Sequence, residues 1–159
     1  MLAIFPSPLG LIALEEEENR LIRLFFPENA VPIPPSSSLL REAARQLDCY
    51  WVGELKAFSL PLAPKGTPFQ REVWQGLQAI PYGCTLSYGQ FAARIGHPRA
   101  CRAVGQANGK NPLPILIPCH RVIAADGSLG GYSAGALIKK RLLALEGVSP
   151  WRDDLPLLR

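Results

Sequence analysis

The chain has 159 residues, of which 48% are hydrophobic and 19% are charged. This composition is typical of a folded protein of ordinary size and excludes an intrinsically disordered chain. No apolar run is long enough for a membrane span, and residues 1–13 lack the basic start and cleavage pattern of a signal peptide. We therefore expect a cytoplasmic protein that does not bind membranes.

Four cysteines are scattered along the chain without a Cys-x-x-Cys pair. This spacing argues against a disulfide framework and against a zinc site, so we expect reduced thiols and no metal. The sequence also has no glycine-rich strand-to-helix turn of the kind that binds a nucleotide-like cofactor, and we expect no cofactor.

The formal net charge of +4 is unevenly distributed. Residues 1–66 carry six Lys and Arg against eight Asp and Glu, whereas residues 67–159 carry eleven against five. A basic surplus of this kind often marks a polyanionic partner, although a solvated basic face is the commoner explanation when no motif accompanies it.

The first part of the chain is predicted to be an α/β unit. Two strands at about 9–14 and 20–26, joined through an acidic turn, form a hairpin. A loop rich in Pro and Ser follows, and apolar residues at helical spacing then predict a helix at about 38–52. The segment LPLAPKG breaks this pattern where the charge changes sign, so we place a domain boundary at residues 64–66, between domains 1–66 and 67–159.

The second part begins with two short helices that carry capping signals. Thr67 and Gln70 form a predicted capping box with Pro68 at the first helical position, and Ser87 and Gln90 repeat the capping box.

The next helix is expected to begin at Pro98 and to end at Gly109, and it would form a candidate helix-turn-helix with the helix before it. Its expected inner face consists of small residues, namely Ala100, Ala103, Val104 and Ala107. On spacing alone, an ordinary αα-hairpin is the commoner structure. However, Arg99 and Arg102 project from this slim helix, which suits phosphate contacts and insertion into a base stack.

The last predicted helix spans about 134–146, with Leu137, Ile138, Leu142 and Leu145 facing inward. Glu146 stands at its carboxyl end, where the helix dipole disfavours a carboxylate. Such a residue is usually only solvated, but beside an imidazole it would have a function.

The segment NPLPILIPCHRVI, residues 111–123, contains the main candidate for chemistry. Free cysteine is usually a small buried hydrophobe, so Cys119 could simply fill the core. However, His120 and Arg121 place a base and a fixed positive charge next to the sulfur, which favours the thiolate. Three prolines also make the segment a stiff, extended approach to a turn. We therefore interpret Cys119 as a candidate nucleophile.

In this context the sequence resembles the O6-alkylguanine-DNA alkyltransferases, which repair alkylated guanine by taking the alkyl group onto their own cysteine. The resemblance covers residues 67–147 in order, through SYGQFA, RAVGQA, NPLPILIPCHRVI, GYSAG and LLALEG, and it is loose in the amino-terminal part. It implies an α/β fold in which a small ribonuclease-H-like domain packs on a mostly helical domain that contains a helix-turn-helix.

The resemblance also implies a role for each matched residue. Cys119 would accept the alkyl group in a single irreversible reaction. His120, acting through a water, would take the thiol proton, and Glu146 would hold the imidazole. Tyr88 would donate its phenolic proton to a ring nitrogen of the base, and Asn111 would tie the helix pair to the active-site turn.

The target atom lies inside a duplex, so the base would be flipped out of the stack, and Arg102 would fill the gap with its helix in the minor groove. The resemblance implies a DNA-contacting surface of Arg99, Arg102, Ala103, Gly105, Ala107 and Tyr88. It implies a substrate pocket of Tyr132, Ser133, Val122 and Pro114, with Ser133 on the O6 side of the base. Ala134, where many relatives have glycine, bears on how readily bulky adducts fit.

The implied partner is double-stranded DNA that contains alkylated guanine, and the protein would join the nucleoid when bound to it. Activity on alkylated thymine stays open, as does cooperative assembly on DNA by a protein expected to be monomeric in solution.

Two alternatives stay open as well. A DNA-binding regulator would use the helix-turn-helix without chemistry and would leave alkylated DNA unchanged. A cysteine hydrolase would use Cys119, His120 and Glu146, turn over repeatedly and ignore DNA, but it would leave Tyr88 and Arg102 unexplained.

Overall fold

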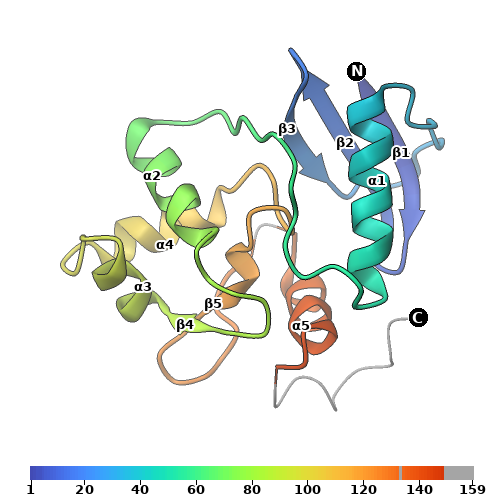
Figure 1. Ribbon diagram of the computed structural model, residues 1–159. Helices are drawn as coiled ribbons and strands as arrows, with labels where there is room; N and C mark the ends of the chain where they lie inside the picture. Colours follow the sequence, from blue (N-terminus) through green and yellow to red (C-terminus); the bar gives the residue numbers. More distant parts are fainter. Residues whose placement is uncertain (133, 149–159) are drawn as a thin grey trace.

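The structure, a computed structural model, describes residues 1–132 and 134–148 (Figure 1). Its amino-terminal part is an antiparallel sheet in which β1 (Leu2–Ser7), β2 (Gly10–Glu17) and β3 (Arg20–Phe25) follow one another in chain order. One helix, α1 (Ser38–Trp51), packs against β2 and buries apolar side chains between helix and sheet. The predicted hairpin and the predicted helix are both present.

The strand β1 is not evident from the sequence pattern. Its sequence LAIFPS does not alternate clearly, and Pro6 has no N–H to give to a sheet ladder. The fold accommodates Pro6 because β2 is the only strand that β1 pairs with among the described residues, and a single bridge from Ile4 to Ile33 covers its other side.

The carboxy-terminal part is mostly helical. The two capping boxes predicted from the sequence are present and begin α2 (Pro68–Leu77) and α3 (Tyr88–Arg94). The remaining elements are β4 (Leu86–Ser87), α4 (Cys101–Gly109), a 3₁₀ turn η1 (Cys119–Arg121), β5 (Val122–Ile123) and α5 (Ala136–Leu145). The short strands β4 and β5 pair in parallel, which holds the start of α3 next to η1.

The helix α4 differs from its prediction in two ways. It begins at Cys101 rather than at Pro98, because residues 98–100 form a turn in which the N–H of Ala100 donates to His97 O at 3.0 Å. Val104 and Ala107 are buried as expected, together with Asn108, whereas Ala103, which was also expected on the inner face, is exposed beside Arg102. The packed side of this helix is therefore narrower than the sequence pattern indicated.

The orientation of α5 also needs a correction. Leu137, which was expected to face inward, is 55% exposed, whereas Lys139 is completely buried. The helix begins two residues later than expected, at Ala136, after Gly135 with a φ of +100°. Its buried face contains Lys139, Leu142 and Leu143 and leads to Glu146 at its carboxyl end.

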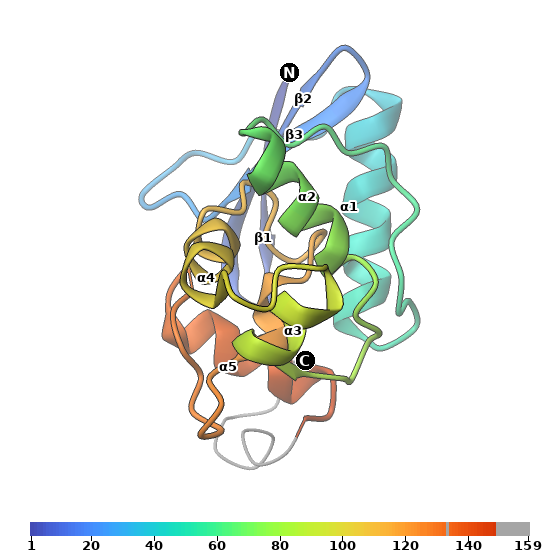
Figure 2. The same cartoon turned by 90° about the vertical axis from the view of Figure 1, so that its left-hand side faces the viewer.

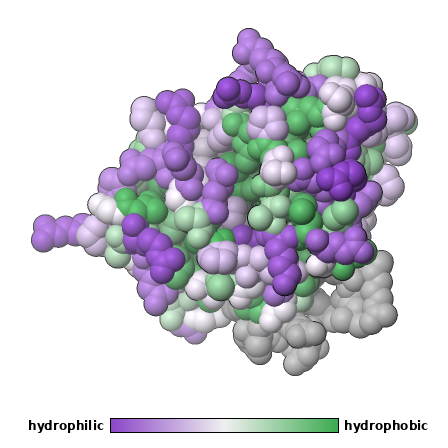
Figure 3. All heavy atoms as spheres, viewed as in Figure 1, coloured by the Kyte–Doolittle hydropathy of each residue, from purple (hydrophilic) through white to green (hydrophobic). Residues whose placement is uncertain are grey.

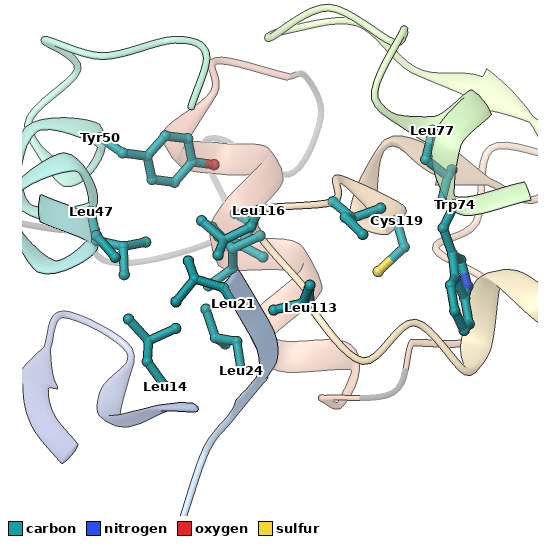
Figure 4. Packing of buried hydrophobic residues seen from close by; sticks show 14 of the residues in the cluster. Leu14, Leu21, Leu24, Leu47, Tyr50, Trp74, Leu77, Leu113, Leu116 and Cys119 are labelled. Carbon is teal, nitrogen blue, oxygen red and sulfur yellow. The ribbon is translucent and has the colours of Figure 1, made fainter. Parts of the chain in front are cut away.

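The two parts share one hydrophobic core. Figure 4 shows Leu21 and Leu24 of β3 close to Leu113 and Leu116, which belong to the segment between α4 and η1. The N–H of Leu24 also donates to Pro112 O at 2.9 Å, so the edge of the sheet holds this segment directly. The segment runs between the two parts of the molecule in both ribbon views (Figures 1 and 2).

Hydrophilic side chains cover most of the face in Figure 3, and the hydrophobic residues on it lie in small patches between them. Among the described helices, none has the length and apolar character that crossing a membrane requires.

Candidate active site

The segment before Cys119 is closed by its own hydrogen bonds. The amide of Asn111 accepts from Leu113 N at 2.9 Å and donates to Ile117 O at 2.8 Å, and Ile117 N donates to Leu113 O at 2.8 Å. Ile115 adopts a φ of +76°, which is unusual for a β-branched residue and turns the chain back on itself. The predicted extended approach is therefore wrong in part, because the chain already turns at Ile115 before it reaches η1, and Asn111 is the residue that braces this turn.

Cys119 begins η1 and is completely buried. Burial raises the pKa of its thiol to about 11, although the Asn111 amide, the Lys139 ammonium and the Tyr132 hydroxyl act in the opposite direction. Arg121, which was expected beside the sulfur, points elsewhere: its guanidinium binds Glu146 and the carbonyl of Ile80. The positive charge that affects the thiol is therefore Lys139 and not Arg121.

His120 and Glu146 form a buried pair, although they lie 26 positions apart. Nε2 of His120 is 2.7 Å from Oε2 of Glu146, and neither side chain is exposed. Because an ionised carboxylate only accepts hydrogen bonds, Nε2 carries the proton and Nδ1 has the free lone pair. Nδ1 is buried and contacts no donor or acceptor in the described part of the chain, so it is available to receive a proton.

Opposing influences set the charges of this pair. Burial lowers the pKa of His120, while the hydrogen bond and the charge of Glu146 act against that shift. Burial alone would raise the pKa of Glu146, but His120 and Arg121 outweigh it and hold the pKa well below its usual range. The site thus combines an ionised carboxylate with a neutral imidazole.

Three further groups donate to the carboxylate, and one of them is the N–H of Gly83, 3.3 Å from Oε1. Arg121 donates from Nε to Oε1 and from a terminal nitrogen to Oε2, each at 2.9 Å, which is a bidentate ion pair. The hydroxyl of Tyr50, from α1, donates to Oε2 at 2.6 Å. The carboxylate at the end of α5 is therefore held by donors from both parts of the molecule.

Lys139 is a candidate functional residue that the sequence interpretation missed. Its ammonium is buried and donates to Val122 O at 2.7 Å and to Gly131 O at 3.3 Å. Burial lowers its pKa to about 8, and the neighbouring Cys119 opposes that shift. A signal was present, because Lys139 precedes Glu146 by about two helical turns and so lies on the same face of α5.

A surface pocket of about 560 Å³ opens next to this site. It is lined by Tyr88, Cys101, Arg102, Gly105, Gln106, Gly109, Gly131 and Tyr132. Burial is the main cause that raises the pKa of Tyr88 and of Tyr132, and the charge of Cys119 raises both further. Both phenols therefore lie close to the sulfur. The pocket therefore lies between the surface of α4 and the buried thiol.

The pocket wall is closely fitted at one point. Gly130 has a φ of +72°, and a Cβ at this position would lie 2.9 Å from the ring of Tyr88. The Tyr88 hydroxyl donates to Gly131 O at 3.4 Å. Only glycine at position 130 lets the loop before α5 approach Tyr88 so closely.

The expected DNA-contacting residues separate into two groups. Arg99, Arg102 and Ala103 are exposed, and Gly105 lines the pocket. Ala107 is 4% exposed, and its carbonyl accepts from Trp74 Nε1 at 2.8 Å, so its predicted place on the DNA-contacting surface is wrong. Val104 and Ala107 are three positions apart, which puts both on the packed side of α4.

The expected pocket residues also differ in their surroundings. Tyr132 lines the pocket near the thiol, while Val122 is fully buried and offers its carbonyl to Lys139. Pro114 lines another hollow, together with residues of β3 and Ala134. Ser133 lies outside the described residues. Within the described ranges, no group of three His, Cys, Asp or Glu side chains could hold a metal ion.

Both parts of the chain match models of one family. Residues 68–148 match the 6-O-methylguanine DNA methyltransferase, DNA binding domain, and residues 2–64 match the 6-O-methylguanine DNA methyltransferase, ribonuclease-like domain.

Named relatives match over nearly their whole length. The chain is 49% identical over 151 residues to the methylated-DNA–protein-cysteine methyltransferase of Methanosarcina acetivorans, which covers 91% of this chain and 97% of that protein. It is 48% identical over 153 residues to the constitutive methylated-DNA–protein-cysteine methyltransferase of Bacillus subtilis, with 90% and 93% covered. A crystal structure of Mycobacterium tuberculosis OGT in complex with DNA is similar with a TM-score of 0.82 and 44% identity, covering 90% of each chain.

Fold and site together define a two-part α/β protein with a buried Cys–His–Glu cluster behind a surface helix pair. The chain belongs to the 6-O-methylguanine DNA methyltransferase family, with an N-terminal ribonuclease-like domain and a C-terminal DNA-binding domain.

Proposed function

We propose that this protein repairs DNA by transferring the alkyl group from O6-alkylguanine in a duplex to its own Cys119, once per chain and irreversibly. The observation that carries the proposal is the buried thiol of Cys119, which adjoins a His120–Glu146 pair and a pocket that opens under the exposed Arg102. The names of its relatives, methylated-DNA–protein-cysteine methyltransferases, agree with this chemistry.

The reaction begins with removal of the thiol proton. Nδ1 of His120 accepts it through one water, and Glu146 stabilises the imidazolium that results. The Lys139 ammonium compensates the negative charge on sulfur. Burial disfavours the thiolate of Cys119. A base that takes the proton and a cation that stabilises the negative charge compensate for this effect.

The transfer itself is an in-line displacement. The sulfur forms a bond to the alkyl carbon while the bond from that carbon to O6 breaks, and the electron pair remains on the guanine. Tyr88 neutralises the developing charge by giving its proton to a ring nitrogen, which restores guanine. The thioether is stable in water, so the protein is consumed by its reaction.

The helix pair α3 and α4 serves as the DNA-binding helix-turn-helix. In this proposal α4 lies in the minor groove, Arg102 occupies the space that the flipped base leaves, and Arg99, Ala103 and Gly105 lie close to the backbone. Tyr132 lines the pocket that receives the flipped base, and the domain boundary falls at residues 64–66. The protein acts on chromosomal DNA, as a monomer.

The proposal is tested with a duplex that contains one O6-methylguanine. Wild-type protein should restore one guanine per chain, measured by nucleoside analysis, while Cys119→Ser should restore none and bind the duplex with wild-type affinity. Cys84→Ser is the matched control, because Cys84 is exposed, and it should behave as the wild type. Binding without repair by the wild type would favour the regulator, and neither binding nor repair would favour a hydrolase that ignores DNA.

A further inference from the structure

The carboxylate of Glu146 is contacted by a residue from the amino-terminal domain. Tyr50 lies near the end of α1, and its hydroxyl donates to Oε2 of Glu146 at 2.6 Å. Figure 4 shows the Tyr50 side chain leaving α1 with its hydroxyl oxygen directed towards the ribbon of α5. The same Oε2 is the atom that His120 Nε2 contacts, at 2.7 Å. Tyr50 and the imidazole of His120 therefore contact the same carboxylate oxygen.

The packing around Tyr50 fixes its hydroxyl in this position. The side chain is 1% exposed, and its ring lies 5.3 Å from Trp51, 5.3 Å from Phe58 and 6.0 Å from Tyr82, measured between ring centroids. Burial, followed by the charge of Glu146, raises the pKa of Tyr50 well above its usual value. The phenol is therefore protonated near neutral pH and donates its proton to the hydrogen bond with the carboxylate.

We propose that Tyr50 is a positioning residue that controls the basicity of His120 through their shared carboxylate oxygen, so that the amino-terminal domain is part of the proton relay. The inference rests on the role of His120 in the proposed function. A donor to Oε2 withdraws negative charge from the carboxylate, and the carboxylate then attracts an imidazolium less strongly.

The other charged and titratable groups around His120 show why this control matters. Arg121 of η1 and Lys139 of α5 act on His120 directly. Tyr82, from the loop before β4, and Tyr132, from the loop before α5, interact with its partner Glu146. The Glu146 carboxylate favours the imidazolium, while Arg121 and Lys139 oppose it. Tyr50 acts with the two cations, because it weakens the carboxylate. It keeps the imidazole neutral, and a neutral Nδ1 is what the relay needs.

The direct test is an NMR titration of the unreacted protein. The chain has two histidines, so each imidazole signal can be assigned without ambiguity. Tyr50→Phe removes only the hydroxyl, and the midpoint of His120 should rise by about one pH unit, since a hydrogen bond to a charged group contributes about 1.5 kcal/mol or more. His97, which pairs with Glu72 on the surface, gives the second imidazole signal and serves as an internal reference.

Tyr82→Phe is the matched control. Tyr82 belongs to the same aromatic cluster, but its hydroxyl donates to the main-chain oxygen of Leu145 at 3.2 Å and not to the carboxylate. The His120 midpoint in this variant should equal that of the wild type. An unchanged midpoint in Tyr50→Phe, or an equal shift in both variants, overturns the inference.

The rate of methyl transfer in a single turnover gives a second measurement. In Tyr50→Phe the acid limb of the pH profile should move to higher pH by as much as the His120 midpoint moves, with the plateau preserved. The reason is that a more basic imidazole already becomes protonated, and so inactive as a base, at a higher pH. A uniform loss of rate with an unmoved limb means that Tyr50 only supports the structure, and it contradicts the inference. If the His120 midpoint moves while the rate profile does not, the inference stands and the assignment of His120 as base in the proposed function fails.

Discussion

Cys119 owes its proposed reactivity to neighbours in space and not to neighbours in sequence. Burial raises the pKa of the thiol to about 11. A thiol with this pKa is almost entirely protonated at neutral pH. The adjacent Arg121 does not correct this, because its guanidinium is engaged by Glu146. The cation that lowers the thiol pKa against the effect of burial is Lys139, on a helix farther along the chain. The motif around the cysteine identifies the nucleophile, but only the fold reveals its cation.

Lys139 leads to a prediction about pH. Its pKa is lowered to about 8, so its charge is lost as the pH rises through that value and the thiolate loses its stabilisation. The wild-type transfer rate should therefore fall above about pH 8. Lys139→Met should lower the rate at pH 7 about tenfold and should abolish this alkaline limb. Single-turnover rates between pH 6 and pH 10, in steps of about half a unit, measure both effects.

Lys140→Met is the control for this experiment. It removes the same charge from the next position of α5, where the side chain is only half-buried. This variant should keep both the rate and the alkaline limb. A Lys139→Met protein with the wild-type profile would remove Lys139 from the site chemistry.

At the scale of elements, local signals were sufficient to locate helices but not to orient them. The capping boxes place the starts of α2 and α3 correctly, because a cap depends on residues only three positions apart. The buried faces of α4 and α5 depend on what packs against them, so the outward direction of Ala103 and Leu137 could not be predicted. Ala107 is the opposite case, because its helical spacing places it on the packed side of α4, where its carbonyl accepts a hydrogen bond from Trp74 of α2.

The exposed face of α4 carries the next prediction. If Arg102 fills the stack after base flipping, Arg102→Ala should slow repair in duplex DNA about tenfold, while its reaction with free O6-methylguanine should keep the wild-type rate. Arg99→Ala is the matched control, because Arg99 is exposed nearby but does not line the pocket. It should weaken duplex binding only slightly. Equal slowing of Arg102→Ala on both substrates would indicate a general defect and would exclude the proposed role.

At the scale of the whole molecule, the sequence predicts that the chain has two parts with different roles. It does not predict the contacts between these parts. The change of charge and the break at LPLAPKG point to two units, and the motifs that carry the family resemblance fall in the second. The strand β1 was missed because Pro6 disrupts its pattern. The bond from Tyr50 to Glu146 joins residues 96 positions apart, and no local pattern in the sequence could have indicated it.

The two parts thus form a single functional unit. The sheet edge holds the active-site segment through Leu24, α1 reaches the carboxylate through Tyr50, and the basic half supplies the thiol and the surface helices. In this account the amino-terminal domain supports the geometry of the site, and it also contributes a hydrogen bond to the relay.

The central claim is that one sulfur permanently keeps a carbon taken from damaged DNA. Its most direct test is the intact mass of the protein after incubation with a duplex that contains O6-methylguanine, followed by peptide mapping. The account predicts that each chain gains one methyl group and that the peptide containing Cys119 carries it. An unchanged mass, or a methyl group on any other residue, would contradict it.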